Sequence, residues 1–437
     1  MQALLRIGAL AALACATTAA LTASPAARAA PATPGTILFA RPLLETGAFN
    51  DRPIGSAIYS IRDDGFGERQ LTPLTEGVFN VPDDSLEPFL TISTWHGNAF
   101  SPSGNYSLFL RVHADGEGGL PFQDGKYFVM NAYGQRMPPL FPGGNDLQPP
   151  KDGPSYGYVS WGPADANAIA YANSASNAPV HHACVRLMHP NGSGDHKLWC
   201  ADDCPPYLSS IQGIRWSGDG KNLLVSVLIT DPRHPFPPHR GDLYRIKVAT
   251  GTATRIQTNI ETPEIAGSSD LSYDGHEAVY ETNVPHACTS AVPDQIVVCA
   301  KNLVTGQRTA LLDPDRALIF AGTQVLLTPD GSQVVMEGTD PSSKAAELYL
   351  VDTDGTRVRK LTQPCVPLDP AGSREVIWEG VRLSPDGKRL LANCYVETFT
   401  PQTGTHGSSR IYIVNLVDGS ARYITDGYAY DWHVPAA

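Results

Sequence analysis

Three short phrases in different parts of the chain carry a polar residue at the same position of a repeat. Each phrase begins six residues before the second residue of a recurring turn phrase, and the three are Trp95-His-Gly97, Ile211-Gln-Gly213 and Trp378-Glu-Gly380. The middle residues, His96, Gln212 and Glu379, are therefore expected at equivalent points of a repeated element. A histidine, an amide and a carboxylate that converge could bind a polar ligand or, alternatively, hold a divalent metal ion.

Aromatic and basic residues stand beside these three. Trp95 and Trp378 could stack on a sugar ring, although tryptophans at such positions also serve as core residues. Arg215 and Arg382 flank the same positions and are candidates for binding an acidic group. The bland alternative is a channel lined by polar side chains and water, with no ligand.

The turn phrase itself recurs along most of the chain. Its second residues lie at 101, 162, 217, 272, 328 and 384, so the steps are 61, 55, 55, 56 and 56 residues. The copies are Phe100-Ser-Pro-Ser-Gly104, Trp161-Gly-Pro-Ala-Asp165, Trp216-Ser-Gly-Asp-Gly220, Leu271-Ser-Tyr-Asp-Gly275, Leu327-Thr-Pro-Asp-Gly331 and Leu383-Ser-Pro-Asp-Gly387. A fixed period of this size indicates a repeat architecture.

Each repeat reads as strands and turns without a helix. In residues 327–362 the turn phrase is followed by alternating strands at 332–337 and 346–352, a Thr353-Asp-Gly355 hairpin turn and a last strand at 358–362. Pro, Asp and Gly favour tight turns because they fix φ, accept local hydrogen bonds and allow positive φ, respectively. Four antiparallel strands per unit predict an all-β fold, a β-propeller.

The two ends of the chain complete the repeat count. Residues 36–40, 57–61 and 69–72 read as the second, third and fourth strands of a blade without its first strand. Residues 428–433 read as that missing strand. We therefore expect a ring of seven blades closed by terminal strands that share a blade, and six blades if the Trp161 unit is not one.

The repeat resembles that of the TolB-type periplasmic β-propellers. The resemblance lies in "LSPDGKRLL", "ELYLVDTDGTRVRKLT" and "RIYIVNLVDGSARYIT" and extends over most of the chain. It implies a propeller that binds partners in the cell envelope. The first expected strand follows the leader directly, so the N-terminal α/β domain of TolB is expected to be absent, which weakens the analogy with its envelope role.

The N-terminus has the features of an export signal. Arg6 precedes an apolar stretch at 7–21, and Ala27-Arg-Ala29 fits a cleavage site. We expect a signal peptide at residues 1–29, a propeller domain at 30–437, and a periplasmic or secreted bacterial protein. Anchoring through Cys15 is the alternative, because residues 12–15 resemble a lipoprotein cleavage box.

Charge and hydropathy bound the partners. The formal net charge is −12, and an acidic surface repels phosphate backbones, so we expect no nucleic-acid partner. No segment after the leader is long and apolar enough to span a bilayer. We expect a monomer whose partner is an envelope or extracellular protein, or an oligosaccharide.

Seven cysteines follow the leader, and export permits disulfides. Cys184 and Cys200 flank the turn at 191–194 almost symmetrically, which favours a bond between them. Further reasonable pairs are Cys288 with Cys299 and Cys365 with Cys394, which leaves Cys204 over. Other pairings remain compatible with the sequence.

The histidines are unevenly distributed on the expected fold. Eight of the twelve fall on the face that carries the loops between second and third strands. His189, His196 and His276 map to the opposite face, which carries the turn phrases.

We expect a binding or scaffold role rather than catalysis, with no cofactor. The chain leaves no room for the separate catalytic domain that follows related repeats in prolyl oligopeptidase-like peptidases. Oligogalacturonate lyases have related repeats and bind a metal, so the set of His96, Gln212 and Glu379 resembles their type of site at the level of the fold. The alternative is therefore a metal-assisted lyase acting on an acidic oligosaccharide at the channel mouth.

Overall fold

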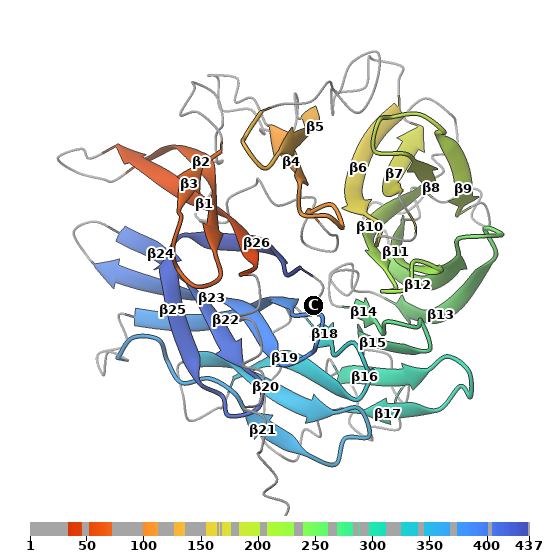
Figure 1. Ribbon diagram of the computed structural model, residues 1–437. Helices are drawn as coiled ribbons and strands as arrows, with labels where there is room; N and C mark the ends of the chain where they lie inside the picture. Colours follow the sequence, from red (N-terminus) through yellow and green to blue (C-terminus); the bar gives the residue numbers. More distant parts are fainter. Residues whose placement is uncertain are drawn as a thin grey trace, which may run out of the picture. The chain divides into compact units, whose positions relative to one another are not determined.

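Strands and turns make up the described part of the chain. The computed structural model describes residues 34–45, 52–71, 99–111, 126–135, 154–163, 166, 168–175, 183–201, 208–230, 239–260, 269–282, 288, 297–311, 325–339, 345–367, 374–400 and 404–435. All of them belong to the unit Pro34–Ala436. No helix occurs in these ranges, which confirms the prediction of an all-β fold (Figure 1).

Consecutive strands pair with one another to form the sheets. One sheet comprises β6 (Pro154–Trp161), β7 (Ile169–Ala175), β8 (Ala183–Met188) and β9 (His196–Cys200). The next comprises β10 (Leu208–Trp216), β11 (Asn222–Thr230), β12 (His239–Lys247) and β13 (Ala253–Ile260). A third comprises β14 (Ser269–Leu271), β15 (Glu277–Thr282), β16 (Val297–Asn302) and β17 (Arg308–Ala310). The Trp161 unit, the weakest copy in sequence, thus forms a sheet of the same kind.

Two further groups of four strands follow the same plan. They are β18 (Val325–Leu327), β19 (Gln333–Thr339), β20 (Ala345–Asp352) and β21 (Val358–Lys360), then β22 (Arg374–Leu383), β23 (Arg389–Thr400), β24 (Gly404–Asn415) and β25 (Ala421–Asp426). A short parallel pairing of β20 with β22 joins the two groups into one sheet of eight strands. A two-stranded sheet pairs β4 (Tyr106–Arg111) with β5 (Lys126–Asn131).

The last sheet combines strands from both ends of the chain. Its order is β26 (Tyr428–His433), β1 (Thr36–Glu45), β2 (Arg52–Arg62) and β3 (Arg69–Gln70). Thr36 lies opposite His433 in the antiparallel register. The buried Asn393 of β23 holds β26 from the other side, because its amide donates to the Ala429 carbonyl at 3.1 Å and accepts from the Ala429 N–H at 2.8 Å.

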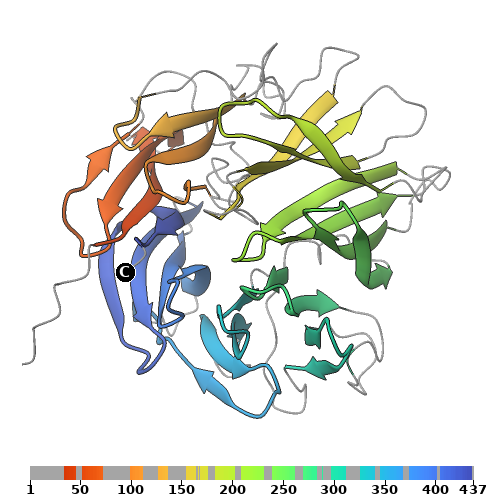
Figure 2. The same cartoon turned by 45° about the vertical axis from the view of Figure 1, so that its right-hand side comes forward.

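Each sheet buries its faces against its neighbours in sequence. Figure 2 shows the sheets following one another around a common centre. Single core clusters are shared by β6–β9 and β10–β13, and by β10–β13 and β14–β17. The same sharing continues through β18–β21 and β22–β25 to the sheet of β26 and β1–β3, and from there to β4–β5. Each of these clusters joins two neighbouring groups of strands, as expected for a repeat fold.

The turn phrases are built on one hydrogen-bond pattern. The hydroxyl of the buried Ser or Thr donates to the Asp two residues on and accepts the N–H five residues on. The pattern occurs at Ser217, Ser272, Thr328 and Ser384. At Thr328 the hydroxyl lies 2.7 Å from Asp330 Oδ1 and 3.0 Å from the Gln333 N–H. The hydrogen bond from Thr328 is the main reason why the pKa of Asp330 is lowered.

The glycine that ends each phrase also sets the spacing between sheets. Gly275 has a φ of 72°, and a Cβ there would lie 2.5 Å from Nδ2 of Asn222 in the preceding sheet. Gly331 repeats this arrangement against Glu277 at 3.2 Å. Glycine is required here both by the positive φ and by the close approach of the next sheet.

Three disulfide bonds lie within or beside the sheets. They join Cys184 to Cys200, Cys288 to Cys299 and Cys365 to Cys394, the pairs favoured by the sequence. Cys184 and Cys200 are directly opposite on β8 and β9. Cys204 lies outside the described residues.

The turn pattern predicts a defined loss of stability for Thr328→Val. This change keeps the shape but leaves the Gln333 N–H without its acceptor, so the free energy of unfolding should fall by about 1–3 kcal/mol in urea denaturation. The matched control is Thr356→Val, at an exposed turn with the same kind of Thr–Asp contact. An equal loss in both variants would show that burial of the turn is not what makes the hydroxyl important.

His433 should give the protein a specific pH dependence. The centroid of its ring lies 6.0 Å from that of the Phe100 ring. Burial lowers the pKa of His433, and the charge of Asp431 opposes this shift. The unfolded chain then binds the proton more tightly, so this contribution to stability is present above about pH 6.5 and is lost as the pH falls below it. We expect His433→Gln to reduce the loss of unfolding free energy between pH 7.5 and 5.5, and the exposed His196→Gln to leave it unchanged.

Candidate functional site

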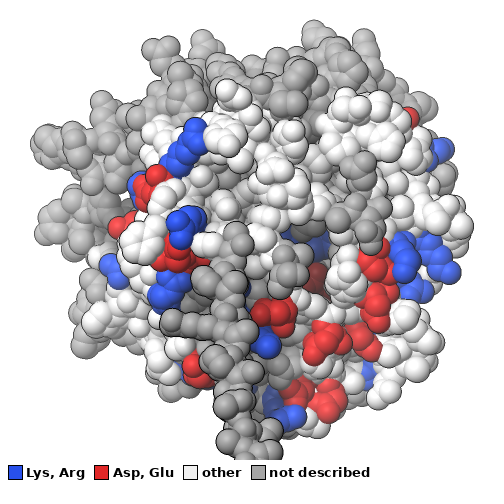
Figure 3. Space-filling view, viewed as in Figure 1, with Lys and Arg blue, Asp and Glu red and all other residues white. Residues whose placement is uncertain are grey.

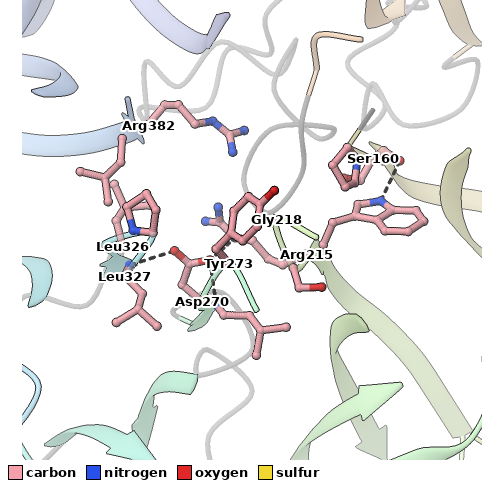
Figure 4. Close-up of a pocket in the computed structure, with 14 residues that line it drawn as sticks. Ser160, Arg215, Gly218, Asp270, Tyr273, Leu326, Leu327 and Arg382 are labelled. Carbon is pink, nitrogen blue, oxygen red and sulfur yellow. Dashed lines mark hydrogen bonds and ion pairs between the residues drawn. The ribbon is translucent and has the colours of Figure 1, made fainter. Parts of the chain in front are cut away.

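The inner strands β6, β10, β14, β18 and β22 end around one pocket of about 170 Å³. Each contributes the residue two positions before the second residue of its turn phrase. These residues are Ser160, Arg215, Asp270, Leu326 and Arg382. Figure 4 shows the side chains of Arg215 and Arg382 directed toward the same space from different strands, with Tyr273 beside them.

Arg215 is the most unusual of these residues. Its side chain is 9% exposed, and Nε has no hydrogen-bond partner among the described residues. Its ion pair with Asp270 spans 4.0 Å, which is too long for a hydrogen bond. Burial lowers the pKa of the guanidinium, with the Asp270 carboxylate opposing and the nearby Arg382 adding to the effect. A cation with so few partners is costly to bury.

Arg382 is held more firmly than Arg215. Its Nε donates to Oδ1 of Asp431 in β26 at 2.8 Å. The other oxygen of Asp431 accepts the backbone N–H groups of Ala99 and Phe100, at 2.7 and 2.9 Å. One buried carboxylate thus connects β22, β26 and the segment Ala99–Phe100 that precedes β4.

Asp270 makes the corresponding connection elsewhere. Its Oδ2 accepts the N–H of Leu327 in β18 at 2.9 Å, while Arg215 of β10 approaches Oδ1. The order is again an arginine, then an aspartate one sheet on, then backbone N–H groups one sheet further. We call these two connections the Arg–Asp relays, namely Arg215–Asp270–Leu327 and Arg382–Asp431–Ala99/Phe100.

The pocket therefore combines two cations with one lining carboxylate. Arg215, Arg382 and Asp270 line it directly, and Asp431 does not belong to its lining. Figure 3 shows basic and acidic atoms at the bottom of a recess near the centre of the view. Tyr273, 55% exposed, adds a phenol at the rim. This arrangement is suited to a small anion that can accept hydrogen bonds from guanidinium groups.

Gln212 and Glu379 do not keep the equivalence expected from the sequence. Gln212 is the extra residue of a β-bulge in β10, whereas in β22 the extra residue is Val381 and Glu379 pairs with Asn393. Gln212 donates to Ser210 Oγ at 2.7 Å, and Glu379 accepts a hydrogen bond from the Tyr428 hydroxyl. A bulge reverses which face a side chain occupies, and a turn-phrase alignment does not detect it.

Of the two tryptophan candidates, the structure describes only Trp378. Trp378 is 1% exposed, packs 4.9 Å from the Tyr412 ring and donates to the Gln363 carbonyl at 2.9 Å. It is a core residue whose ring cannot stack on a ligand in this structure. Trp95 and His96 lie outside the described residues, so their role stays a prediction.

Sequence reasoning missed Asp270, Asp431 and Tyr273. Asp270 stands at the same distance before its turn phrase as Arg215 and Arg382, so the alignment used for the arginines could have found it. Asp431 stands at the corresponding place in the closing strand, two residues before His433. Tyr273 replaces the proline of its phrase and carries no such signal.

One phrase overlooked in the sequence matches the nucleophile-elbow pattern of serine hydrolases. It is Gly153-Pro-Ser-Tyr-Gly157. Ser155 lies within β6, paired with Ser174 of β7, and no helix follows in the described residues. An elbow needs a sharp turn from a strand into a helix, and the strand pairing of Ser155 differs from that arrangement.

Two comparisons by sequence give no relative. No protein-family model matches the chain. No curated protein matches it either.

Solved structures show similarity of fold. An oligogalacturonate lyase from Vibrio parahaemolyticus has a TM-score of 0.51 at 12% identity, over 90% of this chain and 87% of that one. An oligogalacturonate lyase in complex with manganese has a TM-score of 0.50 at 14% identity, over 91% and 86%. A putative TolB from Agrobacterium tumefaciens has a TM-score of 0.40 at 15% identity, over 84% and 99%. The all-β sheets and the similarity to the two lyases indicate a β-propeller-type fold.

The described residues hold no ready metal centre. No group of three or more His, Cys, Asp or Glu side chains is placed there to bind an ion. No helix in the described ranges is long and apolar enough to cross a membrane.

The second Arg–Asp relay should be important for stability. Asp431→Ala would leave Arg382 without its carboxylate and the N–H groups of Ala99 and Phe100 without acceptors. We expect the free energy of unfolding to fall by about 3 kcal/mol or more in denaturant titrations. A change below about 1 kcal/mol would contradict a structural role for the relay. The exposed Asp418→Ala serves as the control.

Arg215→Met should behave differently. Removing a buried cation with an unsatisfied Nε relieves its desolvation, and methionine fills a similar volume. We expect the free energy of unfolding to stay within about 1 kcal/mol of the parent or to rise. A loss as large as that of Asp431→Ala would mean that Arg215 is needed for the fold.

Proposed function

We propose that this chain is an exported seven-bladed β-propeller whose terminal strands close the ring. The described strands fall into seven groups if the pair β4–β5 is counted as part of one blade. The shared sheet of β26 and β1 supports the closure, since it pairs the first strand with the last. The three disulfides support export, because such bonds persist in oxidising compartments.

Within this fold we propose a binding protein for a small anionic ligand, taken up at the central pocket. The observation that carries the proposal is the convergence of Arg215 and Arg382 on one pocket, with Arg215 buried and unsatisfied at Nε. A carboxylate or similar anion entering the pocket would supply the missing acceptor. The ligand completes the hydrogen bonding that the protein alone leaves open.

The other sheets support a functional role for this charge. At the same register, β18 carries Leu326 and β6 carries Ser160. An apolar or small polar side chain is thus compatible with the fold at this position. A buried arginine in the same place exceeds what packing requires, and unsatisfied buried charge is commonly associated with binding sites.

A lyase acting on an acidic oligosaccharide is the second candidate. The support is the fold shared with two oligogalacturonate lyases and a pocket suited to a uronate carboxylate. Elimination also needs a base that takes the proton next to the carboxylate, and no His or Lys lines the pocket in the described residues. A metal at His96, Gln212 and Glu379 would have to engage a glutamate that already accepts from Tyr428. We therefore place binding first.

Calorimetry with digalacturonate as the probe tests the proposal. We expect the parent protein to bind digalacturonate and the neutral galactose disaccharide to give no heat. Arg215→Met should weaken binding at least about tenfold while keeping the thermal stability of the parent, since it removes a charge-assisted contact worth about 1.5–3 kcal/mol. Lys388→Met, at an exposed turn, is the control for loss of a positive charge.

Ultraviolet absorbance of the same mixtures separates the two candidates. Binding without formation of an unsaturated uronate, with or without added Mn²⁺, supports a binding protein. Formation of that product identifies a lyase. Equal binding by the parent and Arg215→Met would remove the central pocket as the site in either case.

A further inference from the structure

A second, larger hollow lies on the side of the turn phrases. It has a volume of about 1170 Å³ and is lined by turns from three neighbouring sheets, β6–β9, β10–β13 and β14–β17. It shares no lining residue with the central pocket. His189, His196 and His276, which the sequence assigned to this face, all line it.

Its lining is basic although the chain is acidic. The charged and titratable side chains around it are His189, His196, His276, Lys221, Arg245, Lys247, Asp219 and Asp274. With His counted as neutral, the three cations Lys221, Arg245 and Lys247 exceed the two carboxylates, whereas the chain has a formal net charge of −12 on the same count. The hollow is therefore a local departure from the average charge of the protein.

Both aspartates are already engaged in their own turns. Burial alone would raise the pKa of Asp219, but the Lys221 N–H and the Ser217 hydroxyl lower it, and Lys221 Nζ lies 3.2 Å away. Asp274 likewise accepts from Ser272 and the His276 N–H and lies 3.1 Å from the His276 ring. Neither carboxylate forms an ion pair with the basic residues of β12 that line the hollow.

Arg245 and Lys247 are the charges that remain. They are two residues apart in β12, so their side chains lie on the same face of the strand. Neither has an acidic partner among the described residues. Arg245 donates only a long 3.4 Å hydrogen bond to the Gly275 carbonyl, which holds its side chain across the gap between two sheets. Lys247 is exposed to solvent.

An apolar rim accompanies these charges. Val304, at the turn after β16, is 68% exposed, and Leu303 and Val248 line the hollow beside it. A peptide with acidic and apolar side chains would use both features, as protein–protein interfaces do. We propose that this hollow binds an acidic peptide segment of a partner protein, with Arg245 and Lys247 contacting its carboxylates and Val304 its apolar side chains.

The test measures fluorescence anisotropy of a labelled peptide of glutamates with two leucines. We expect binding at low salt that weakens steeply as salt rises, because exposed charge pairs are screened. Arg245→Gln with Lys247→Gln should weaken binding about fivefold or more. The control double variant, Arg62→Gln with Lys388→Gln, removes two exposed cations elsewhere and should leave binding unchanged.

Further arms decide between the possible occupants. Val304→Ser should weaken binding of the labelled peptide, and a peptide with glutamine in place of glutamate should not bind. Equal loss in the control double variant would show attraction to charge in general and overturn the proposal. Tight binding of oligogalacturonate that depends on Arg245 but not Val304 would also overturn it, in favour of a sugar polymer. Arg215→Met should not change binding of the peptide, because Arg215 lines the central pocket and not this hollow.

Discussion

The contact between neighbouring inner strands is the constraint on which the rest of the structure depends. Among the described residues, the core clusters join neighbouring groups of strands, so the packing of each group depends on the next. At the centre this contact is made by backbone N–H groups that need acceptors, and Asp270 and Asp431 supply them. Each aspartate reaches forward to one sheet and is approached by an arginine from the sheet behind. The Arg–Asp relays therefore combine cohesion of the sheets with a charged centre.

The two relays differ in how tightly they are made. Arg382 lies 2.8 Å from its aspartate, whereas Arg215 lies 4.0 Å from its own. The first arrangement is that of a structural ion pair. The second leaves a desolvated cation with unused hydrogen-bonding capacity beside a pocket. The same two residue types, in the same register, thus form a close ion pair in one place and leave a hydrogen-bond donor unused in another.

The sequence contained most of the fold because the turn phrases report local chemistry. A Ser or Thr, an Asp and a Gly at fixed spacing specify one hydrogen-bonded turn, and strands must follow on both sides. The same alignment found Arg215 and Arg382 because both precede a phrase by a constant distance. It could not show that Gln212 and Glu379 stand in different registers, since the bulge in β10 lies at Gln212 and the one in β22 lies at Val381. Contacts between sheets, such as Asp431 with Ala99, join residues 332 positions apart and leave no local pattern.

The sheet formed from both chain ends has a consequence for the order of folding. Its strands β1, β2 and β3 are made long before their inner partner β26, which follows all the other described strands in the chain. Until β26 is made, β1 lacks the neighbour against which Thr36 is registered. This sheet can therefore be completed only after β26 has been made. A variant truncated before residue 428 would lose the inner strand, and β1 would keep only its pairing with β2.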